Sequence, residues 1–199
     1  MADEFEVDYQ RLLISMSLLK QVEDSDYTQQ HSLRVGRLVK KMATKLGYDI
    51  KKINLITRSA YFHDIGKIKL SKNVIFKVGA LTDKEYDEMK LHPEYSEDIL
   101  LSLGLYEEAK IARSHHERLN GSGYPNGLKG EEIGDEVRLL AVADVFDAIT
   151  SDRPYRRSLS IPEAVLFLYS KTDDEVDLKM VKILHEVLID EKKISNKLS

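Results

Sequence analysis

The stretch Ala60-Tyr-Phe-His-Asp-Ile-Gly-Lys67 is the one around which the rest of this chain is organised. An apolar helical run stops here at His63 and Asp64, which place an imidazole beside a carboxylate. Because neighbours on an α-helix do not share a face, both can serve one site only if it spans two metal ions or the helix unwinds. Gly66 is free to take positive φ and permits this unwinding, after which Lys67 lies within reach of an anionic substrate. The His63-Asp64 pair alone is weak evidence for a metal site, since a histidine on an apolar helix is more often a packed core residue.

The composition is that of an ordinary globular protein, with 42% apolar and 32% charged residues in a chain of 199. A net charge of −4 argues against a nucleic-acid partner, because such domains usually carry a basic excess. The chain has no cysteine, so disulfides and thiolate metal ligands are excluded. It has no signal-peptide pattern at its start and no apolar run approaching about eighteen residues, so we expect a cytoplasmic protein with no membrane segment.

The apolar pattern predicts an all-α protein. Apolar residues recur at helical spacing along most of the chain, and strand patterning is nearly absent. We expect a single compact bundle of about seven to nine helices. Residues that favour the N-cap position predict where several helices begin: Thr28, Asp49, Thr82, Ser160 and Asp177. Further helices are expected over residues 9–23, 93–103 and 105–116, and the last helix is expected to end near residue 190.

The run from Asp135 to Ile149 is too apolar all round for a surface helix, so we expect it at the centre of the bundle. Asp144 lies inside this run. A carboxylate there is costly to bury unless it is paired or bound to a metal ion, which makes Asp144 a candidate ligand.

Residues 117–134 form the longest predicted loop and hold five of the ten glycines. A loop of this length inside a compact domain is usually functional or disordered. Apolar residues recur through it, at Leu119, Tyr124-Pro125, Leu128 and Ile133. These recurring apolar residues favour a structured functional loop over a tolerated surface insertion.

Seven imidazole and carboxylate side chains stand at predicted helix ends or inside apolar helices: His31, His63, Asp64, His92, His115, His116 and Asp144. They include five of the six histidines, and they are more than one transition metal ion needs. The set therefore predicts two metal ions bridged by a carboxylate, for which Asp64 is the candidate, and by a solvent oxygen. Without a thiolate, iron, manganese, zinc and nickel all remain compatible.

Several motifs together resemble the HD-GYP family, a subgroup of the HD metal-dependent phosphohydrolases that act on cyclic di-GMP. The matching segments are Tyr27-Thr-Gln-Gln-His-Ser-Leu-Arg-Val35, His63-Asp-Ile-Gly-Lys67, His92-Pro93, His115-His-Glu-Arg-Leu-Asn-Gly-Ser-Gly-Tyr-Pro-Asn-Gly-Leu128 and Ala143-Asp-Val-Phe-Asp-Ala-Ile-Thr-Ser-Asp-Arg-Pro-Tyr-Arg156. The resemblance spans about residues 27–187 and implies a helical HD-domain bundle with a glycine-rich GYP loop. On this basis we expect residues 1–25 to be a helical extension and residues 26–199 to be the HD-GYP domain.

The resemblance also implies residue roles. It assigns metal binding to the seven candidate ligands, and phosphate or guanine contacts to Lys67, Tyr124, Arg153 and Arg156. From the chemistry of phosphodiester hydrolysis we expect Asp64 and Lys67 to be the catalytic residues. Tyr124 is expected either to stack on guanine or to shape the loop, and Glu117 is expected to support a histidine rather than bind metal. Family members that hold three metal ions have a glutamate where this chain has Tyr27. The resemblance therefore points to two divalent or mixed-valence transition metal ions, with iron or manganese favoured and zinc or nickel compatible.

The implied reaction is hydrolysis of cyclic di-GMP to linear pGpG by a metal-bridging hydroxide, with further cleavage to GMP less assured. One alternative is hydrolysis of another cyclic dinucleotide, such as cyclic GMP-AMP, or of a nucleotide. The other is a non-catalytic adaptor that responds to cyclic di-GMP and contacts a signalling protein through the GYP loop. Such an adaptor would usually lack some ligands, and this chain departs from the family pattern only at Tyr27.

Overall fold

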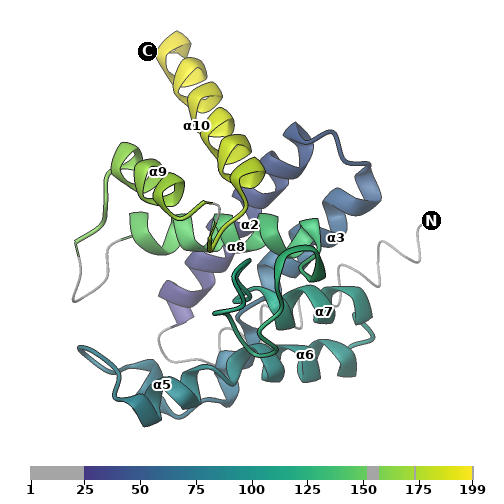
Figure 1. Ribbon diagram of the computed structural model, residues 1–199, viewed down its shortest axis with the longest axis vertical. Helices are drawn as coiled ribbons and strands as arrows, with labels where there is room; N and C mark the ends of the chain where they lie inside the picture. Colours follow the sequence, from purple (N-terminus) through teal and green to yellow (C-terminus); the bar gives the residue numbers. More distant parts are fainter. Residues whose placement is uncertain (1–24, 152–156, 173, 199) are drawn as a thin grey trace.

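The computed structural model describes residues 25–151, 157–172 and 174–198. The predicted helical extension over residues 1–25, with its helix at 9–23, therefore lies almost wholly outside the described residues. The elements follow in the order α2 (Ser25–Lys45), α3 (Ile50–Phe62), the 3₁₀ helix η1 (Ile65–Lys69), α4 (Lys72–Ile75), α5 (Asp83–Met89), α6 (His92–Ser102), α7 (Tyr106–Ser114), the 3₁₀ helix η2 (Gly130–Glu132), α8 (Asp135–Thr150), α9 (Ile161–Ser170) and α10 (Leu178–Leu198) (Figure 1).

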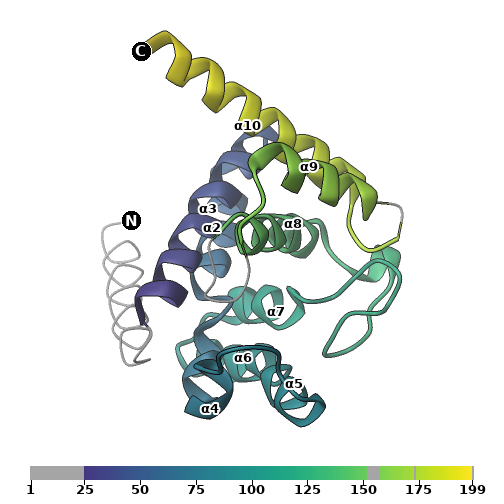
Figure 2. The ribbon, with the colours of Figure 1, turned by 90° about the vertical axis from the view of Figure 1, so that its left-hand side faces the viewer.

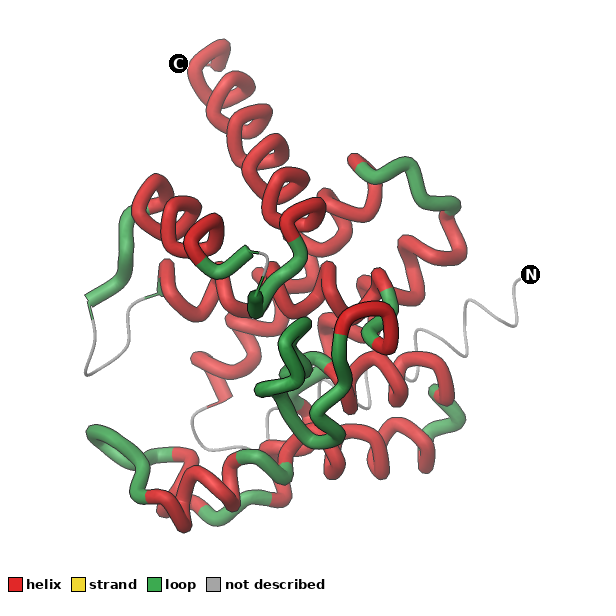
Figure 3. Tube along the Cα trace, viewed as in Figure 1, coloured by secondary structure: helices red, strands yellow, loops and turns green. Residues whose placement is uncertain are grey.

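The predicted all-α class is confirmed. Among the described residues, β-pairing is limited to isolated bridges, and Figure 3 shows helices joined by loops with no strand. The short elements η1 and α4 were not predicted, because a helix of four or five residues is too short to display an apolar period. No helix in the described ranges combines the length and apolarity needed to cross a lipid bilayer.

Several helix starts follow the predicted caps. The side chain of Asp49 accepts the N–H of Lys52 (2.9 Å), and that of Asp177 accepts the N–H of Met180 (3.1 Å). Capping boxes stand at the starts of α5 and α9, as predicted. The predicted helix start at Thr28 is wrong, because Thr28 lies inside α2, which already includes Ser25. Polar residues such as those around Ser25 occur in the first turn of a helix as well as in the loop before one. The last helix is also longer than predicted and ends at Leu198.

Helix α8 is the centre of the bundle, as its composition predicts. Apolar residues on nearly every side of it are buried, and α2, α7, α9 and α10 all pack against it. Figure 2 shows α6, α7, α8 and α9 in successive layers, with α10 extending beyond them. Because α8 is enclosed in this way, two of its four acids, Asp144 and Asp147, are buried as well.

The break after α3 is held by close packing against α6. Helix α3 ends at Phe62, and Asp64 has φ −98° and ψ 4°, outside helical geometry, before η1 begins. The hydroxyl of Ser96 accepts the N–H of Gly66 (2.8 Å) and donates to the carbonyl of His63 (2.7 Å). One buried serine on α6 thus fastens both sides of the break.

Gly66 is needed here for space and not for a left-handed conformation. Gly66 is not among the glycines with positive φ, so the expectation that it unwinds the helix through a left-handed conformation is wrong. A Cβ at this position would lie 2.1 Å from the carbonyl oxygen of His92 and 2.4 Å from the backbone nitrogen of Ser96. Only glycine lets η1 approach α6 closely enough to bring Asp64 beside His92.

We expect Gly66→Ala to lower the free energy of unfolding by about 3 kcal/mol, because the added methyl group forces η1 away from the α6 backbone. Urea unfolding followed by circular dichroism measures this effect. Gly134→Ala is the matched control, since its Cβ would meet only the flexible carboxylate of Glu136 at 3.0 Å, and we expect it to cost less than about 1 kcal/mol. Equal unfolding free energies for the two variants would contradict the close-approach explanation.

Candidate metal centre

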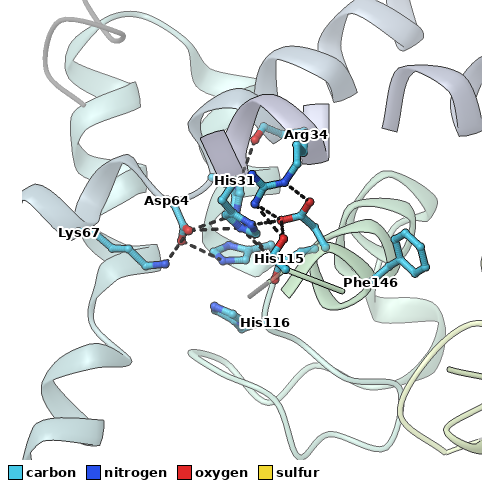
Figure 4. A network of polar contacts seen from close by, with 12 residues as sticks. His31, Arg34, Asp64, Lys67, His115, His116 and Phe146 are labelled. Atoms are coloured by element: carbon cyan, nitrogen blue, oxygen red, sulfur yellow. Dashed lines mark hydrogen bonds and ion pairs between the residues drawn. The ribbon is translucent and has the colours of Figure 1, made fainter. Parts of the chain in front are cut away.

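The structure brings all seven candidate ligands into one buried cluster. They come from α2, the end of α3, the start of α6, the end of α7 and the middle of α8. Figure 4 labels four of them: His31, Asp64, His115 and His116. Their ligand atoms form three overlapping groups, within each of which all atoms lie within 4.8 Å of one another: His92 with His115 and His116, His31 with His63 and Asp64, and His63 with His115 and Asp144. Side chains separated by more than a hundred residues therefore converge on one small volume.

Asp64 lies between two sets of histidines. Its Oδ2 atom is 3.4 Å from Nε2 of His63 and 3.7 Å from Nε2 of His31. Its Oδ1 atom is 3.2 Å from Nε2 of His92 and 3.9 Å from Nε2 of His115. The two oxygens of one carboxylate thus face different imidazole sets, which is the arrangement that a bridging carboxylate between two ions requires.

Three of the histidines are oriented by the main chain in the same way. The Nδ1–H of each donates to the carbonyl three residues earlier, from His63 to Ala60 (2.8 Å), from His92 to Met89 (2.7 Å) and from His115 to Ala112 (2.6 Å). A carbonyl oxygen can only accept a hydrogen bond, so Nδ1 carries the proton in each neutral ring. The Nε2 atoms are therefore left with their lone pairs directed into the cluster.

These lone pairs fit a cation. Nε2 of His92 lies 3.3 Å from Nε2 of His115 and 3.2 Å from Nε2 of His116, so unprotonated nitrogens of His92 and His115 face each other. Nε2 of His63 is buried without a hydrogen-bond partner. Buried nitrogens are rarely left in this state, and a metal ion among them would turn lone-pair repulsion into ligation. The donor set of imidazoles and carboxylates without thiolate suits iron, manganese, zinc or nickel.

The electrostatics around Asp64, His115 and His116 favour the protonation states that bind metal. Burial raises the pKa of Asp64, but the charge of Lys67 and the nearby His63 and His92 outweigh it and hold that pKa well below its usual range. Burial, reinforced by the neighbouring imidazoles, holds the pKa values of His115 and His116 well below the ordinary value for histidine. The carboxylate is thus ionised and these two imidazoles are neutral at pH 7.

His31 differs from the other histidines because it lies between two acids of α8. Its Nε2 is 3.0 Å from Oδ1 of Asp144, and its Nδ1 is 2.8 Å from Oδ2 of Asp147. Burial lowers the pKa of His31, but the hydrogen bonds to Asp144 and Asp147 outweigh it and raise the pKa to about 9. Sequence reasoning missed Asp147, although its position three residues after Asp144 places both acids on one face of α8.

A cavity of about 370 Å³ opens onto the cluster. Lys67 and Tyr124 line it, as do Arg118 and Tyr86, which sequence reasoning missed. The Nζ of Lys67 donates to Oδ2 of Asp64 (2.6 Å) at the cavity wall. A larger groove of about 910 Å³ lies between α2 and α10, but its lining contains no histidine.

The other predicted substrate contacts have different outcomes. Tyr124 stacks on His116, with ring centroids 4.7 Å apart, so one face of its ring is already covered. Arg153 and Arg156 lie outside the described residues, and so does the side chain of Tyr27. Their predicted roles stay predictions.

Glu117 organises the GYP loop. We expected it to support a histidine, which is wrong, because its Oε1 accepts the N–H of Asn126 (2.7 Å) and its Oε2 accepts the N–H of Leu128 (2.9 Å). Glu117 is only 2% exposed. A buried carboxylate that receives two backbone N–H groups fixes the loop to the residues directly after His115 and His116.

Comparison with known proteins places these observations in a family context. A family model described as HD domain matches residues 14–180. The chain is 38% identical over 158 residues to the cyclic di-GMP phosphodiesterase response regulator RpfG of Xanthomonas campestris, an alignment that covers 76% of this chain and 41% of that protein. It is 34% identical over 165 residues to 3′3′-cGAMP-specific phosphodiesterase 3 of Vibrio cholerae, with coverage of 82% and 36%. The chain therefore spans less than half the length of these two relatives.

A solved structure shares the fold. Bd1817, an HDG"Y"P protein from Bdellovibrio bacteriovorus, superposes with a TM-score of 0.67 at 23% sequence identity. The superposition covers 81% of this chain and 52% of that one. At this level of identity the likeness establishes the fold alone.

We expect Glu117→Gln to speed amide hydrogen exchange at Asn126 and Leu128 by about tenfold or more, because one of the two N–H groups loses its acceptor and faces an amide NH₂. Hydrogen exchange measured by NMR or mass spectrometry tests this. The control is Glu132→Gln, since Glu132 also accepts a loop N–H, from Lys129 (2.8 Å), but is exposed to water. Equal protection of the loop in Glu117→Gln and the parent protein would contradict the role of Glu117.

Proposed function

This chain belongs to the HD domain family, in its HD-GYP subgroup, and from this premise we propose that it is a metal-dependent phosphodiesterase that hydrolyses cyclic di-GMP to linear pGpG. The observation that carries the proposal is the position of Asp64, whose two oxygens face different histidine sets beside an open cavity. The relative RpfG is named a cyclic di-GMP phosphodiesterase, which supports this choice of substrate.

We propose that the cluster holds two ions that share Asp64. His31, His63 and Asp144 would complete the ligands of one ion, and His92, His115 and His116 those of the other. Two such cations supply positive charge opposite a phosphodiester and lower the pKa of water toward neutrality. Iron or manganese is the proposed metal, and zinc or nickel is compatible with the same donors.

Lys67 is the proposed residue that meets the reacting phosphate. Its ammonium group lies at the cavity wall, 2.6 Å from Oδ2 of Asp64, and it carries three donors of which the carboxylate uses one. A remaining N–H can donate to a non-bridging phosphate oxygen, or the ammonium can give its proton to the leaving oxygen. Lys67 therefore has the reach and the charge for either step.

We propose Arg118 as an additional contact to the substrate. Cyclic di-GMP has two phosphates, and among the described residues that line the cavity, Lys67 and Arg118 are the lysine and arginine side chains. The Nη1 atom of Arg118 donates to the carbonyls of His115 (3.3 Å) and Glu117 (2.8 Å), which holds the guanidinium at the cavity edge. Its planar fork suits the second phosphate, beside the predicted clamp of Arg153 and Arg156.

Tyr124 has a narrower role in this proposal than in the sequence prediction. Because His116 covers one face of its ring, only the other face is open to a guanine base. We propose that Tyr124 mainly holds His116 and the loop in place.

We propose linear pGpG as the final product because this chain has a tyrosine, Tyr27, where family members with three metal ions have a glutamate. A protonated tyrosine is a poor ligand for a third divalent ion.

A second substrate is a real competitor, because one relative is named a 3′3′-cGAMP-specific phosphodiesterase and is 34% identical to this chain. The two dinucleotides share the cyclic phosphodiester ring and differ in one purine base. Turnover of both by the same preparation decides between them. The cytoplasmic location and the contact of the loop with a signalling protein stay predictions.

We expect the protein loaded with Mn²⁺ or Fe²⁺ to convert cyclic di-GMP to pGpG, and we expect Asp64→Ala to lose both bound metal and turnover, since both ions share this carboxylate. Elemental analysis and product chromatography measure the two effects. Asp98→Ala is the control, because Asp98 is an exposed acid on α6 whose side chain is 63% accessible. Full turnover by Asp64→Ala, or no turnover of either dinucleotide by the loaded parent protein, would refute the proposed function.

We expect Arg118→Ala to raise KM for cyclic di-GMP by about 10-fold or more while kcat changes little, because a hydrogen-bonded charge contact to substrate is lost. Steady-state kinetics at several substrate concentrations separate the two constants. Arg37→Ala removes an exposed arginine from α2 and should leave both unchanged. An unaltered KM in Arg118→Ala would exclude the contact.

A further inference from the structure

His31 is oriented differently from the other histidines of the cluster. His63 and His115 are the C-cap residues of α3 and α7, and His92 begins α6, so each finds a main-chain carbonyl for its Nδ1–H. His31 lies inside α2, where the carbonyls of the surrounding turns are engaged in the helical ladder. Its Nδ1 instead meets Oδ2 of Asp147 at 2.8 Å, across 116 residues of sequence.

Asp147 is itself held firmly. Arg34, one turn after His31 on α2, donates from Nε to Oδ1 of Asp147 (2.7 Å) and from Nη2 to Oδ2 (2.9 Å). The hydroxyl of Ser151 lies 3.3 Å from the same Oδ2 and accepts a further bond from Nη2 of Arg34 (3.0 Å). Figure 4 shows Arg34 beside His31, with the carboxylate network reaching both. The bidentate geometry leaves the carboxylate little freedom to turn.

We propose that Asp147 is a positioning residue for His31, and that Arg34 in turn positions Asp147. A carboxylate only accepts hydrogen bonds, so Asp147 keeps a proton of His31 on Nδ1, and Nε2, which lies beside Asp144, is the nitrogen that would face the proposed metal ion. This inference rests on the proposed metal centre. It also makes the two ions unequal, because the imidazoles anchored by carbonyls do not depend on any side chain, whereas His31 depends on Asp147.

A second buried pair provides a reference for a merely structural role. Arg58 on α3 donates from Nε to Oε1 of Glu108 on α7 (2.8 Å), and Glu108 is only 4% exposed. This pair also joins two helices through a buried carboxylate, but here the carboxylate bonds to Arg58 rather than to a histidine of the cluster. Loss of Glu108 therefore reports what breaking a buried pair does to stability without altering a ligand.

The test measures Mn²⁺ binding to the full chain by isothermal titration calorimetry and equilibrium dialysis. We expect the parent protein to bind two ions and Asp147→Asn to bind one of them about 10–100-fold more weakly, with the other within about threefold of the parent. An amide can offer NH₂ as well as oxygen to Nδ1, so it no longer fixes the proton there. Glu108→Gln should lose thermal stability yet bind both ions as the parent does.

Spectroscopy supplies a readout that a structural role would not move. In protein loaded with Zn²⁺ and labelled with ¹⁵N-histidine, we expect His31 to show a protonated Nδ1, and this signal should be lost or shifted in Asp147→Asn but retained in Glu108→Gln. Arg34→Gln is a second variant in case Asp147→Asn does not fold. The Arg34 side chain is 40% exposed, and its replacement should lower the affinity for the same Mn²⁺ ion by about 3–10-fold.

The outcomes separate this inference from the proposed function. Failure of the parent protein to bind Mn²⁺ would refute the metal centre on which both depend. Two tightly bound ions in the parent, with unchanged affinities in Asp147→Asn and Arg34→Gln, would overturn the positioning role and leave the proposed function intact. An equal loss of Mn²⁺ affinity in Glu108→Gln would also overturn the positioning role, because the lower affinity would then follow from lost stability alone.

Discussion

The buried carboxylate of Asp64 is the group on which the rest of the arrangement depends. Its oxygens face histidines that come from different helices, and Lys67 lies beside it. This position exists only because α3 stops at Phe62 and η1 packs directly on α6. Ser96 and the missing Cβ of Gly66 make that contact possible. The local break in one helix thus decides whether two sets of ligands can meet.

Four of the five histidines in the cluster are held by two different means. His63 and His115 bond to carbonyls of the helices that they end, and His92 bonds to the carbonyl of Met89 at the end of α5, so their orientation follows from the local backbone. His31 is instead held by an acid from another helix, which is in turn bonded to an arginine. The first kind of anchor forms with the local fold, and the second forms only when α2 and α8 pack together. The two halves of the cluster therefore depend on the fold to different degrees.

The GYP loop is ordered by a carboxyl group buried inside it. Glycine-rich segments lose much conformational freedom on folding. The carboxylate of Glu117 offsets this cost by accepting two loop N–H groups, and Tyr124 adds contact by stacking on His116. The loop is consequently fixed to the same helix end that supplies His115 and His116, and its shape and the orientation of these ligands are coupled.

The sequence by itself determined the helical class, the central position of α8, the caps at Asp49 and Thr82, and which imidazoles and carboxylates would gather. These follow from local periodicity and from the chemistry of each side chain, which need no knowledge of neighbours. Only the tertiary structure decided that Gly66 serves close approach, that Glu117 holds the loop and that Asp147 orients His31. Each of these depends on atoms that become neighbours when helices pack, and helix packing is set by the shape of the whole core rather than by any local pattern.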